Sequence, residues 1–241
     1  MAEGELTRGV LADGQARALR VDVAAVAAHG AELHGLRGHA RAWYVEGVAC
    51  AALLSAYLDD GERLSMQVQA SKPRFAFTAD VSSDGGVRAR LSPQDVRSSL
   101  HIRGVMLVLK SVVGREVYRG ATEVDHRSFA AMLESHLVRS SQTDARIRVR
   151  GGVGTLVERL PGEHEIDLDA LVEDAMEGVE GETTPLRWQC SCSEERVLGM
   201  LGSLGESEIR SMIEEDGGAV VTCHYCTRSV VVSEASLREL L

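Results

Sequence analysis

Residues 188–192 have the sequence WQCSC, and residues 222–226 have the sequence TCHYC. Four of the five cysteines of the chain therefore form two tight pairs. Because the thiols of two such pairs can converge on one point, they can supply the tetrahedral four-thiolate environment that zinc prefers. The spacing predicts a site for one Zn²⁺ per chain, with these metal ligands: Cys190, Cys192, Cys223 and Cys226.

The residues around these pairs predict a small module of helices and a hairpin. Ser193 can cap a helix whose apolar residues recur at helical spacing from Val197 to Leu204, and a second short helix follows. The stretches 219–222 and 229–232 predict a hairpin with the second cysteine pair at its tip. So small a unit lacks the apolar core to fold alone, and a structural metal is a usual remedy.

The chain before this module predicts strands and helices in mixed order. Alternating apolar residues in RLSMQVQA (63–70) predict a strand, and SDGG (83–86) predicts a hairpin turn because Asp-Gly tolerates positive φ angles. The stretch 41–58 is apolar on most faces and predicts a largely buried helix. This mixture favours an α+β fold over a doubly wound parallel sheet. The other expected elements are two strands within 8–21, strands at 75–79, 87–91, 104–113, 147–149 and 155–160, and a helix over 125–138.

The composition after residue 162 marks the boundary between the two parts. The stretch 163–185 is acidic, and its apolar residues predict one helix before an expected linker at 178–185. A chain of 241 residues suffices for one medium domain and a small one. The predicted organisation is an N-terminal mixed sheet-and-helix core domain (1–162), an acidic helical segment with linker (163–185) and a C-terminal zinc module (186–241).

Charge and hydropathy exclude several classes of protein. The formal net charge of −10 argues against a nucleic-acid binder held by phosphate contacts. No apolar run reaches membrane-spanning length, and the start MAEGELTRGV lacks the apolar region of a signal peptide. Paired thiols without an export signal indicate a reducing, cytoplasmic setting, in which metal binding or redox sensing outranks a structural disulfide.

Several residues near the predicted ligands are candidates for a supporting role. Four thiolates on Zn²⁺ carry a formal charge of −2, so the flanking Arg187, Arg196 and Arg228 are expected to offset it. His224 lies inside the second pair, but with four cysteines present it is expected to face solvent.

The remaining polar residues give no catalytic constellation, so the chain is not expected to be an enzyme. Cys50 lies in the apolar helix and is expected to be a buried, inert thiol. Asp80 and Asp84 could suggest an acid–base pair. Asp before Gly is common in turns because of its backbone geometry, so no such role is expected for Asp84. The sequence GGVG (151–154) lacks the Lys of a phosphate-binding loop. Solvent exposure is expected for three histidines whose spacing suits no metal site: His29, His34 and His39.

Both ends of the chain carry motifs that resemble the Hsp33 family of redox-regulated holdase chaperones. In the tail, the resemblance lies in WQCSCSEERV (188–197) and ESEIRSMIEEDGGAVVTCHYC (206–226). It extends upstream, in the right order, so that it covers nearly the whole chain. The upstream motifs are LTRGVL (6–11), ERLSMQVQ (62–69), SSDGGVRAR (82–90), VYRGATEVD (117–125), LVRSSQTDARIRV (137–149) and GTLVERLPG (154–162).

The resemblance implies a function and a switch. Members of the family hold zinc on four cysteines and are inactive when reduced. Oxidation with an unfolding stress pairs neighbouring cysteines, here Cys190 with Cys192 and Cys223 with Cys226, and releases the zinc. The module then unfolds, and the protein holds unfolding client proteins without ATP. A homodimer is implied for the oxidised form only.

Three features depart from the family pattern. The stretch 161–190 is shorter than the usual connection and lacks its aromatic, basic helical segment. Ser140-Ser141-Gln142 replaces a Ser-Glu-Gln triplet, and Thr227-Arg228 follows the last cysteine, where a glycine is common.

Two other functions remain open from the residues. A zinc site of this kind is most often structural, so a structural or partner-binding protein whose zinc is never released is the main alternative. A thiol–disulfide oxidoreductase would need a metal-free pair of low pKa at a helix N-terminus, whereas strand-like residues follow Cys226.

Overall fold

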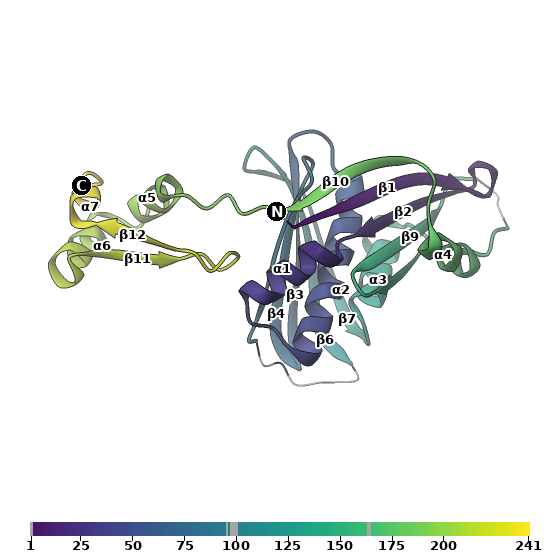
Figure 1. The fold of residues 1–241 in the computed structure, drawn as a ribbon, viewed down its shortest axis with the longest axis horizontal. Helices are drawn as coiled ribbons and strands as arrows, with labels where there is room; N and C mark the ends of the chain where they lie inside the picture. The colour runs from purple at the N-terminus through teal and green to yellow at the C-terminus, as the bar shows by residue number, and fades with distance from the viewer. Residues whose placement is uncertain (1, 95, 97–100, 163–164) are drawn as a thin grey trace. The chain divides into compact units, whose positions relative to one another are not determined.

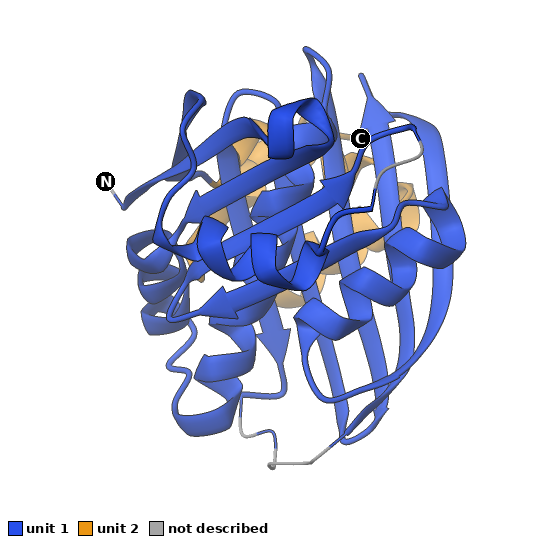
Figure 2. Cartoon of the chain, turned by 90° about the vertical axis from the view of Figure 1, so that its right-hand side faces the viewer, with its two compact units in different colours: residues 1–189 blue, residues 190–241 orange. Residues whose placement is uncertain are grey.

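A computed structural model describes residues 2–94, 96, 101–162 and 165–241. The chain divides into two compact units, Met1–Gln189 and Cys190–Leu241 (Figure 2). Each unit has its own apolar core. The mixture of a large sheet with helices confirms the predicted α+β fold class.

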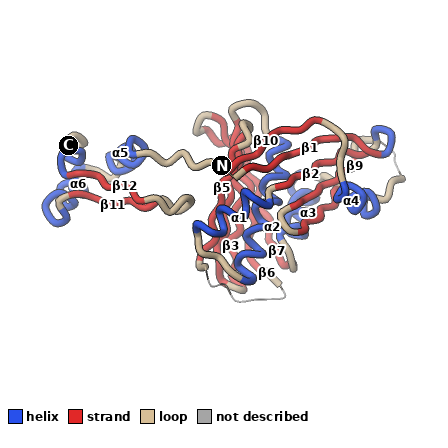
Figure 3. The backbone as a smooth tube through the Cα atoms, in the orientation of Figure 1, coloured by secondary structure: helices blue, strands red, loops and turns tan. Residues whose placement is uncertain are grey.

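Within the described residues, the first unit contains one sheet of ten strands in the order β7-β6-β3-β4-β5-β10-β1-β2-β9-β8 (Figure 3). All neighbouring strands pair antiparallel except β5 and β10, which are parallel. The strands are β1 (Glu3–Leu11), β2 (Ala16–Asp22), β3 (Glu62–Lys72), β4 (Arg74–Ser82), β5 (Gly86–Ser92), β6 (Ile102–Val112), β7 (Arg115–His126), β8 (Ala145–Arg150), β9 (Val153–Arg159) and β10 (Glu182–Trp188).

Three helices of the first unit lie against one face of the sheet (Figure 1): α1 (Ala24–Leu33), α2 (Gly38–Leu54) and α3 (Phe129–Ser141). The main core fills the space between them and the strands. Phe77 of β4 contacts Phe129 of α3 edge to face, with ring centroids 5.0 Å apart. Gly47 of α2 leaves space for the Phe77 ring, because a Cβ atom at this position would lie 2.6 Å from that ring. The largely buried helix predicted over 41–58 is confirmed as α2 followed by a 3₁₀ turn over Ser55–Tyr57.

The fourth helix, α4 (Leu168–Glu177), covers a second, smaller cluster that includes Ala16, Ala18 and Val157. Side chains alternate along a strand, so these residues of β2 and β9 face away from the main core. Asp167 caps α4 through its side chain, which accepts hydrogen bonds from the N–H groups of Asp169 and Ala170.

The strand β10 corrects the expected linker at 178–185. Glu182–Trp188 lies between β1 and β5, paired antiparallel with β1 from Glu3 to Arg8. It has no period-two pattern and contains Pro185, so local rules indicate a loop. Neighbouring strands on both sides fix it in the sheet instead. The boundary between the two compact units falls after Gln189. The division into domains at 1–162 and 186–241 stays a prediction.

The second unit is a small module of helices and one hairpin. Its core contains Val197, Leu201, Ile209, Val232 and Leu237. Ser193 caps the first helix, because its side chain accepts a hydrogen bond from Arg196 N–H. The elements are α5 (Glu194–Gly202), α6 (Glu206–Ser211), a π-helical turn (Met212–Asp216), β11 (Gly218–Thr222), β12 (Ser229–Ser233) and α7 (Glu234–Arg238). In the part of the chain that the structure describes, no helix is long and apolar enough to span a membrane.

Candidate metal centre

The structure brings together the four cysteines that the sequence predicted as ligands. All four sulfur atoms lie within 4.8 Å of one another. The Sγ atoms of Cys190 and Cys223 are 3.6 Å apart, and those of Cys192 and Cys226 are 3.2 Å apart. Each close contact therefore joins one cysteine of the first pair to one of the second.

Two short loops place the sulfur atoms. The first pair follows β10 directly and precedes α5, while the second pair lies in the turn between β11 and β12. That turn is closed by two backbone hydrogen bonds: Cys223 N–H donates to Arg228 O at 2.9 Å, and Thr227 N–H donates to Cys223 O at 2.9 Å. Thr227 has φ of 58°, a left-handed conformation that glycine adopts more readily than other residues.

The donor set fits zinc. Four thiolates around Zn²⁺ at about 2.3 Å each lie about 3.7 Å from one another. The measured separations of 3.2 and 3.6 Å, with an upper limit of 4.8 Å, bracket that value. His224 is exposed, as expected, and is not part of this group.

The two cysteines of the second pair differ in pKa. Burial raises the pKa of the Cys226 thiol to about 12. Burial also opposes ionisation of Cys223, but N–H donors of Cys226 and Tyr225 outweigh it and lower the pKa of Cys223 to about 7. Zinc binds the thiolate form of cysteine, so binding of the metal would release the protons that these thiols hold.

The three arginines predicted to offset the thiolate charge have different partners. Arg228 donates from Nη2 to Cys192 O at 2.6 Å and to Cys192 Sγ at 3.1 Å. Arg196 donates to Ser191 O at 3.2 Å, in the loop between the first two ligands. The prediction for Arg187 was wrong, because its guanidinium pairs with Asp84 at 2.8 Å. The Ser82–Gly86 turn brings that carboxylate to β10, a contact that local sequence does not indicate.

Sequence reasoning missed the anchor of the chain immediately before the first ligand. Trp188 N–H donates to Ala2 O at 3.1 Å, and Gln189 N–H donates to Val87 O at 3.0 Å. The Trp188 ring contacts His29 of α1 edge to face, with centroids 5.6 Å apart. The sequence signal for this anchor was Trp188, an aromatic residue two positions before the ligand Cys190. Its partners lie too far away in sequence to be inferred from it.

The other residues weighed in the sequence lie away from this cluster. Cys50 is completely buried in α2, where burial raises its pKa. Asp80 pairs with Arg88 at 2.8 Å. His29 and His39 are exposed as expected, whereas the prediction for His34 was wrong. His34 is 7% exposed and packs near the Tyr44 ring, because α1 turns its last residues toward α2.

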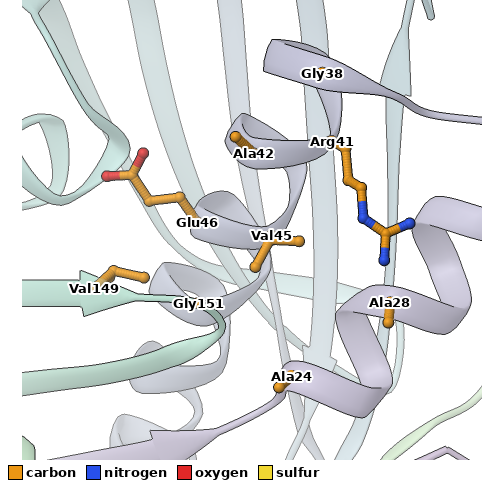
Figure 4. Close-up of a pocket in the computed structure, with 9 residues that line it drawn as sticks. All are labelled: Ala24, Ala28, Gly38, Arg41, Ala42, Val45, Glu46, Val149 and Gly151. Carbon is orange, nitrogen blue, oxygen red and sulfur yellow. The ribbon is translucent and has the colours of Figure 1, made fainter.

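A pocket in the first unit shows no catalytic arrangement. It lies among α1, α2 and the β8–β9 turn, and Figure 4 shows Arg41 and Glu46 on its wall with side chains pointing in different directions. The Glu46 carboxylate accepts a hydrogen bond from Ala130 N–H at 3.1 Å, at the start of α3. Burial raises the pKa of Glu46, and this effect is larger than the opposing effect of the hydrogen bonds from the N–H groups of Ala130 and Phe129. Glu46 thus serves as a cap for α3.

Comparisons with known proteins agree along the whole chain. The 33 kDa chaperonin of Bacillus subtilis (strain 168) is 26% identical, over 98% of this chain and 97% of that protein. The 33 kDa chaperonin of Gloeobacter violaceus is also 26% identical, over 98% of this chain and 95% of that protein. The Bacillus alignment runs over 282 positions, whereas this chain has 241 residues. That relative therefore has residues within the aligned span that this chain lacks.

The fold and the family model lead to the same assignment. A crystal structure of the 33 kDa chaperonin (heat shock protein 33 homolog) from Thermotoga maritima matches with a TM-score of 0.79 and 19% identity. The match covers 100% of this chain and 98% of that chain, so the two proteins share their fold. The family model described as "Hsp33 protein" matches residues 4–183 and 168–233. Because these matches span most of its length, the chain belongs to the Hsp33 family.

Proposed function

We propose that this protein is an ATP-independent holdase chaperone that a four-cysteine zinc centre keeps inactive until it is oxidised. The observation that carries the proposal is the convergence of four sulfur atoms within 4.8 Å, in a chain of this family. Homologues named 33 kDa chaperonin support a chaperone role, for which no catalytic residue is needed. The clients are unfolding proteins. The proposed setting is the reducing cytoplasm, in which thiols stay unpaired until an oxidant arrives.

The zinc ligands in this proposal are Cys190, Cys192, Cys223 and Cys226, with one Zn²⁺ per chain. When bound, zinc supplies a cross-link between the two cysteine pairs. The module has few other sources of stability, since its buried core is five side chains. A site of this kind contributes on the order of 10 kcal/mol to folding.

The oxidation step is balanced for hydrogen peroxide as the oxidant. The two thiolates of one pair give up two electrons and form one S–S bond. The peroxide accepts these electrons and two protons and leaves as two water molecules. Two peroxide molecules pair Cys190 with Cys192 and Cys223 with Cys226, and the site then has no thiolate left for the metal.

The loss of these donors exposes apolar side chains. Val197, Leu201, Ile209, Val232 and Leu237 are buried in the folded module and become available when it unfolds. Unfolding clients present apolar surface as well, so binding needs no sequence motif. A homodimer of the oxidised form is part of the proposal, because the apolar surface exposed on one chain can bind the same surface of a second chain.

Light scattering of a heat-unfolding test protein tests the proposal. The chain is added either reduced and zinc-loaded, or after treatment with peroxide at raised temperature. Suppression of scattering by the oxidised sample alone is the expected result. It should coincide with about one zinc released per chain and two disulfides formed. Equal suppression by both samples would mean that the chaperone lacks a redox switch.

One structural feature favours a second function, a zinc-stapled structural or partner-binding protein. Cys190 follows Gln189, whose N–H is hydrogen-bonded to Val87 O at 3.0 Å in the sheet. The chain therefore has no separate linker before the first ligand that zinc loss could release. If neither sample suppresses scattering and peroxide leaves the zinc in place, this second function is correct.

A further inference from the structure

Arg228 connects the two cysteine pairs of the candidate metal centre. Its carbonyl oxygen accepts a hydrogen bond from Cys223 N–H at 2.9 Å, which fixes it to the second pair. Its guanidinium reaches the first pair, where Nη2 lies 2.6 Å from Cys192 O and 3.1 Å from Cys192 Sγ. One residue thus holds the backbone of one loop and the sulfur of the other.

The other arginines of the module do not make this connection. Arg210 and Arg238 pair with the glutamates four residues before them, Glu206 and Glu234. Arg196 donates to Ser191, in the loop between the first two ligands, rather than to a sulfur atom. Of the four arginines at described positions in the module, Arg228 is the one that donates to a ligand sulfur.

The contact has a chemical consequence for Cys192. A thiolate reacts with oxidants and alkylating reagents through a sulfur lone pair. An N–H donor directed at that sulfur occupies a lone pair and stabilises the negative charge, so the sulfur becomes a weaker nucleophile. A guanidinium also adds one positive charge to a site whose four thiolates and Zn²⁺ carry a formal charge of −2.

We propose that Arg228 is a positioning residue that protects Cys192 and thereby sets how much oxidant is needed to open the metal centre. This inference rests on the proposed function for its biological meaning. The chemistry is the peroxide step given above, in which Cys192 and Cys190 lose two electrons and form one S–S bond. Arg228 slows that step by holding the Cys192 thiolate in a hydrogen bond.

The test compares zinc-loaded wild-type protein with three variants. Arg228→Met removes both the donor and the charge at similar length. Arg228→Lys keeps the charge on a side chain that is shorter by one bond, so its ammonium group lies farther from Cys192 O and Sγ than Nη2 of Arg228 does. Arg238→Met is the matched control, because it removes one positive charge from the same module at a residue paired with Glu234. Reduced protein is treated with N-ethylmaleimide, and the modification of each cysteine is followed by fragment-resolved mass spectrometry. Zinc content is measured in every sample.

The Cys192 rate in zinc-loaded wild-type protein is the reference for all three variants. In Arg228→Met this rate should rise about tenfold, in line with the effect of losing an outer hydrogen bond at a metal site. Arg228→Lys should give an intermediate rate, and Arg238→Met should match the wild type. The rate of zinc release by peroxide should rise in the same order.

Three outcomes would overturn the inference. One is a Cys192 rate in Arg228→Met within about twofold of the wild type, well short of the tenfold effect of a lost outer hydrogen bond. Another is an equal acceleration in Arg238→Met, which would indicate a general charge effect. The third is an Arg228→Met protein without zinc, which would assign Arg228 a structural role. If peroxide leaves zinc in wild-type protein, the proposed switch fails. The maleimide rates still decide the role of Arg228 in that case.

Discussion

Cys50 and Cys192 show at the scale of single residues how surroundings decide what a thiol does. Cys50 is completely buried in α2, and desolvation, followed by the nearby Glu46 and Glu134, raises its pKa well above the ordinary value. Partial burial also opposes ionisation of Cys192, but hydrogen bonds with Cys226 and Arg228 outweigh it and lower its pKa. A reagent for thiolates should therefore distinguish the two residues.

The substitution Cys192→Ser should weaken zinc binding and leave residues 190–241 loosely folded. A serine hydroxyl is a poor replacement for a thiolate on zinc, and the module has only a small core without the metal. Residues 2–162 should stay structured, because their core is separate. Zinc content and limited proteolysis measure both effects.

The matched control for Cys192→Ser is Cys50→Ala, which removes the one cysteine outside the cluster. It should keep one zinc per chain, although the cavity left in α2 lowers the stability of the first unit. If Cys192→Ser retains full zinc and the wild-type protease pattern, the ligand assignment is wrong.

Gly30→Ala should disturb the anchor that precedes the first ligand. A Cβ atom at Gly30 would lie 2.1 Å from the Tyr44 hydroxyl and 2.5 Å from the Trp188 ring. Relief requires both side chains to move, at a cost of about 1–3 kcal/mol in the free energy of unfolding. Denaturant titration of the first unit measures it. Gly199→Ala is the control, since nothing lies within 4 Å of a Cβ there and the change should favour α5.

At the scale of elements, α4 is held to the sheet by charged side chains as well as by its apolar face. Arg148 of β8 pairs with Asp169 and with Glu173, each at 2.8 Å. Arg146 and Arg150 add further pairs with these two carboxylates. Exposed ion pairs contribute little one by one, and a network shared by three arginines is the arrangement in which they matter.

Glu173→Gln should loosen α4 without unfolding the sheet. The substitution removes the charge that Arg148 and Arg150 share, while the apolar contacts of Val172 remain. Amide hydrogen exchange should become faster in α4 at low salt, and the difference from the wild type should shrink as salt is added. Asp174→Asn is the control, because Asp174 lies in the same helix at an exposed position. Equal effects of both substitutions would contradict the role of the network.

The same network predicts how α4 responds to acid. Hydrogen bonds from Arg148 and Arg150 lower the pKa of Glu173 from its ordinary value of 4.5. A carboxyl group whose pKa is lowered by folding adds stability above its ordinary pKa and loses it as pH falls through the folded value. Protection of α4 amides should therefore be constant from pH 7 to about 5 and decrease below the ordinary carboxyl range. Glu173→Gln should show a smaller decrease.

The elements that could be predicted are those with local signals. Alternation in 63–70 predicted β3, and Asp84-Gly85 predicted the turn between β4 and β5. The four-cysteine cluster was predictable because two closely spaced cysteine pairs are typical of a metal site. The strands β7 and β10 and the helices α1 and α7 were not predicted. The position of β10 depends on β1 and β5, which are far from it in sequence.

At the scale of the whole molecule, the chain has two units with separate apolar cores, joined covalently between Gln189 and Cys190. The first unit buries large side chains such as Tyr44, Phe77 and Phe129, whereas the module depends on a few aliphatic residues. The strand β10 is held by β1 and β5, and the next residues of the chain are Gln189 and the first ligand. The sheet should therefore hold β10 whether or not the metal is present.

Removal of zinc tests this independence of the two units. A strong chelator under reducing conditions should unfold residues 190–241, because the small core of the module would lose the cross-link that zinc supplies. The first unit should keep its protection from hydrogen exchange up to Gln189, including the amides of Trp188 and Gln189 that bond to Ala2 and Val87. Exchange mapped by mass spectrometry before and after chelation measures both halves of the prediction.

The control for chelation is zinc added back, which should restore protection in the module. If β10 and α4 lose protection together with the module, zinc also stabilises part of the first unit. The surface released on oxidation would then include the cluster beneath α4, which contains Ala18, Val157 and Val172. If only residues 190–241 lose protection, the clients of the oxidised protein must bind to the unfolded module itself, because no other apolar surface has been released.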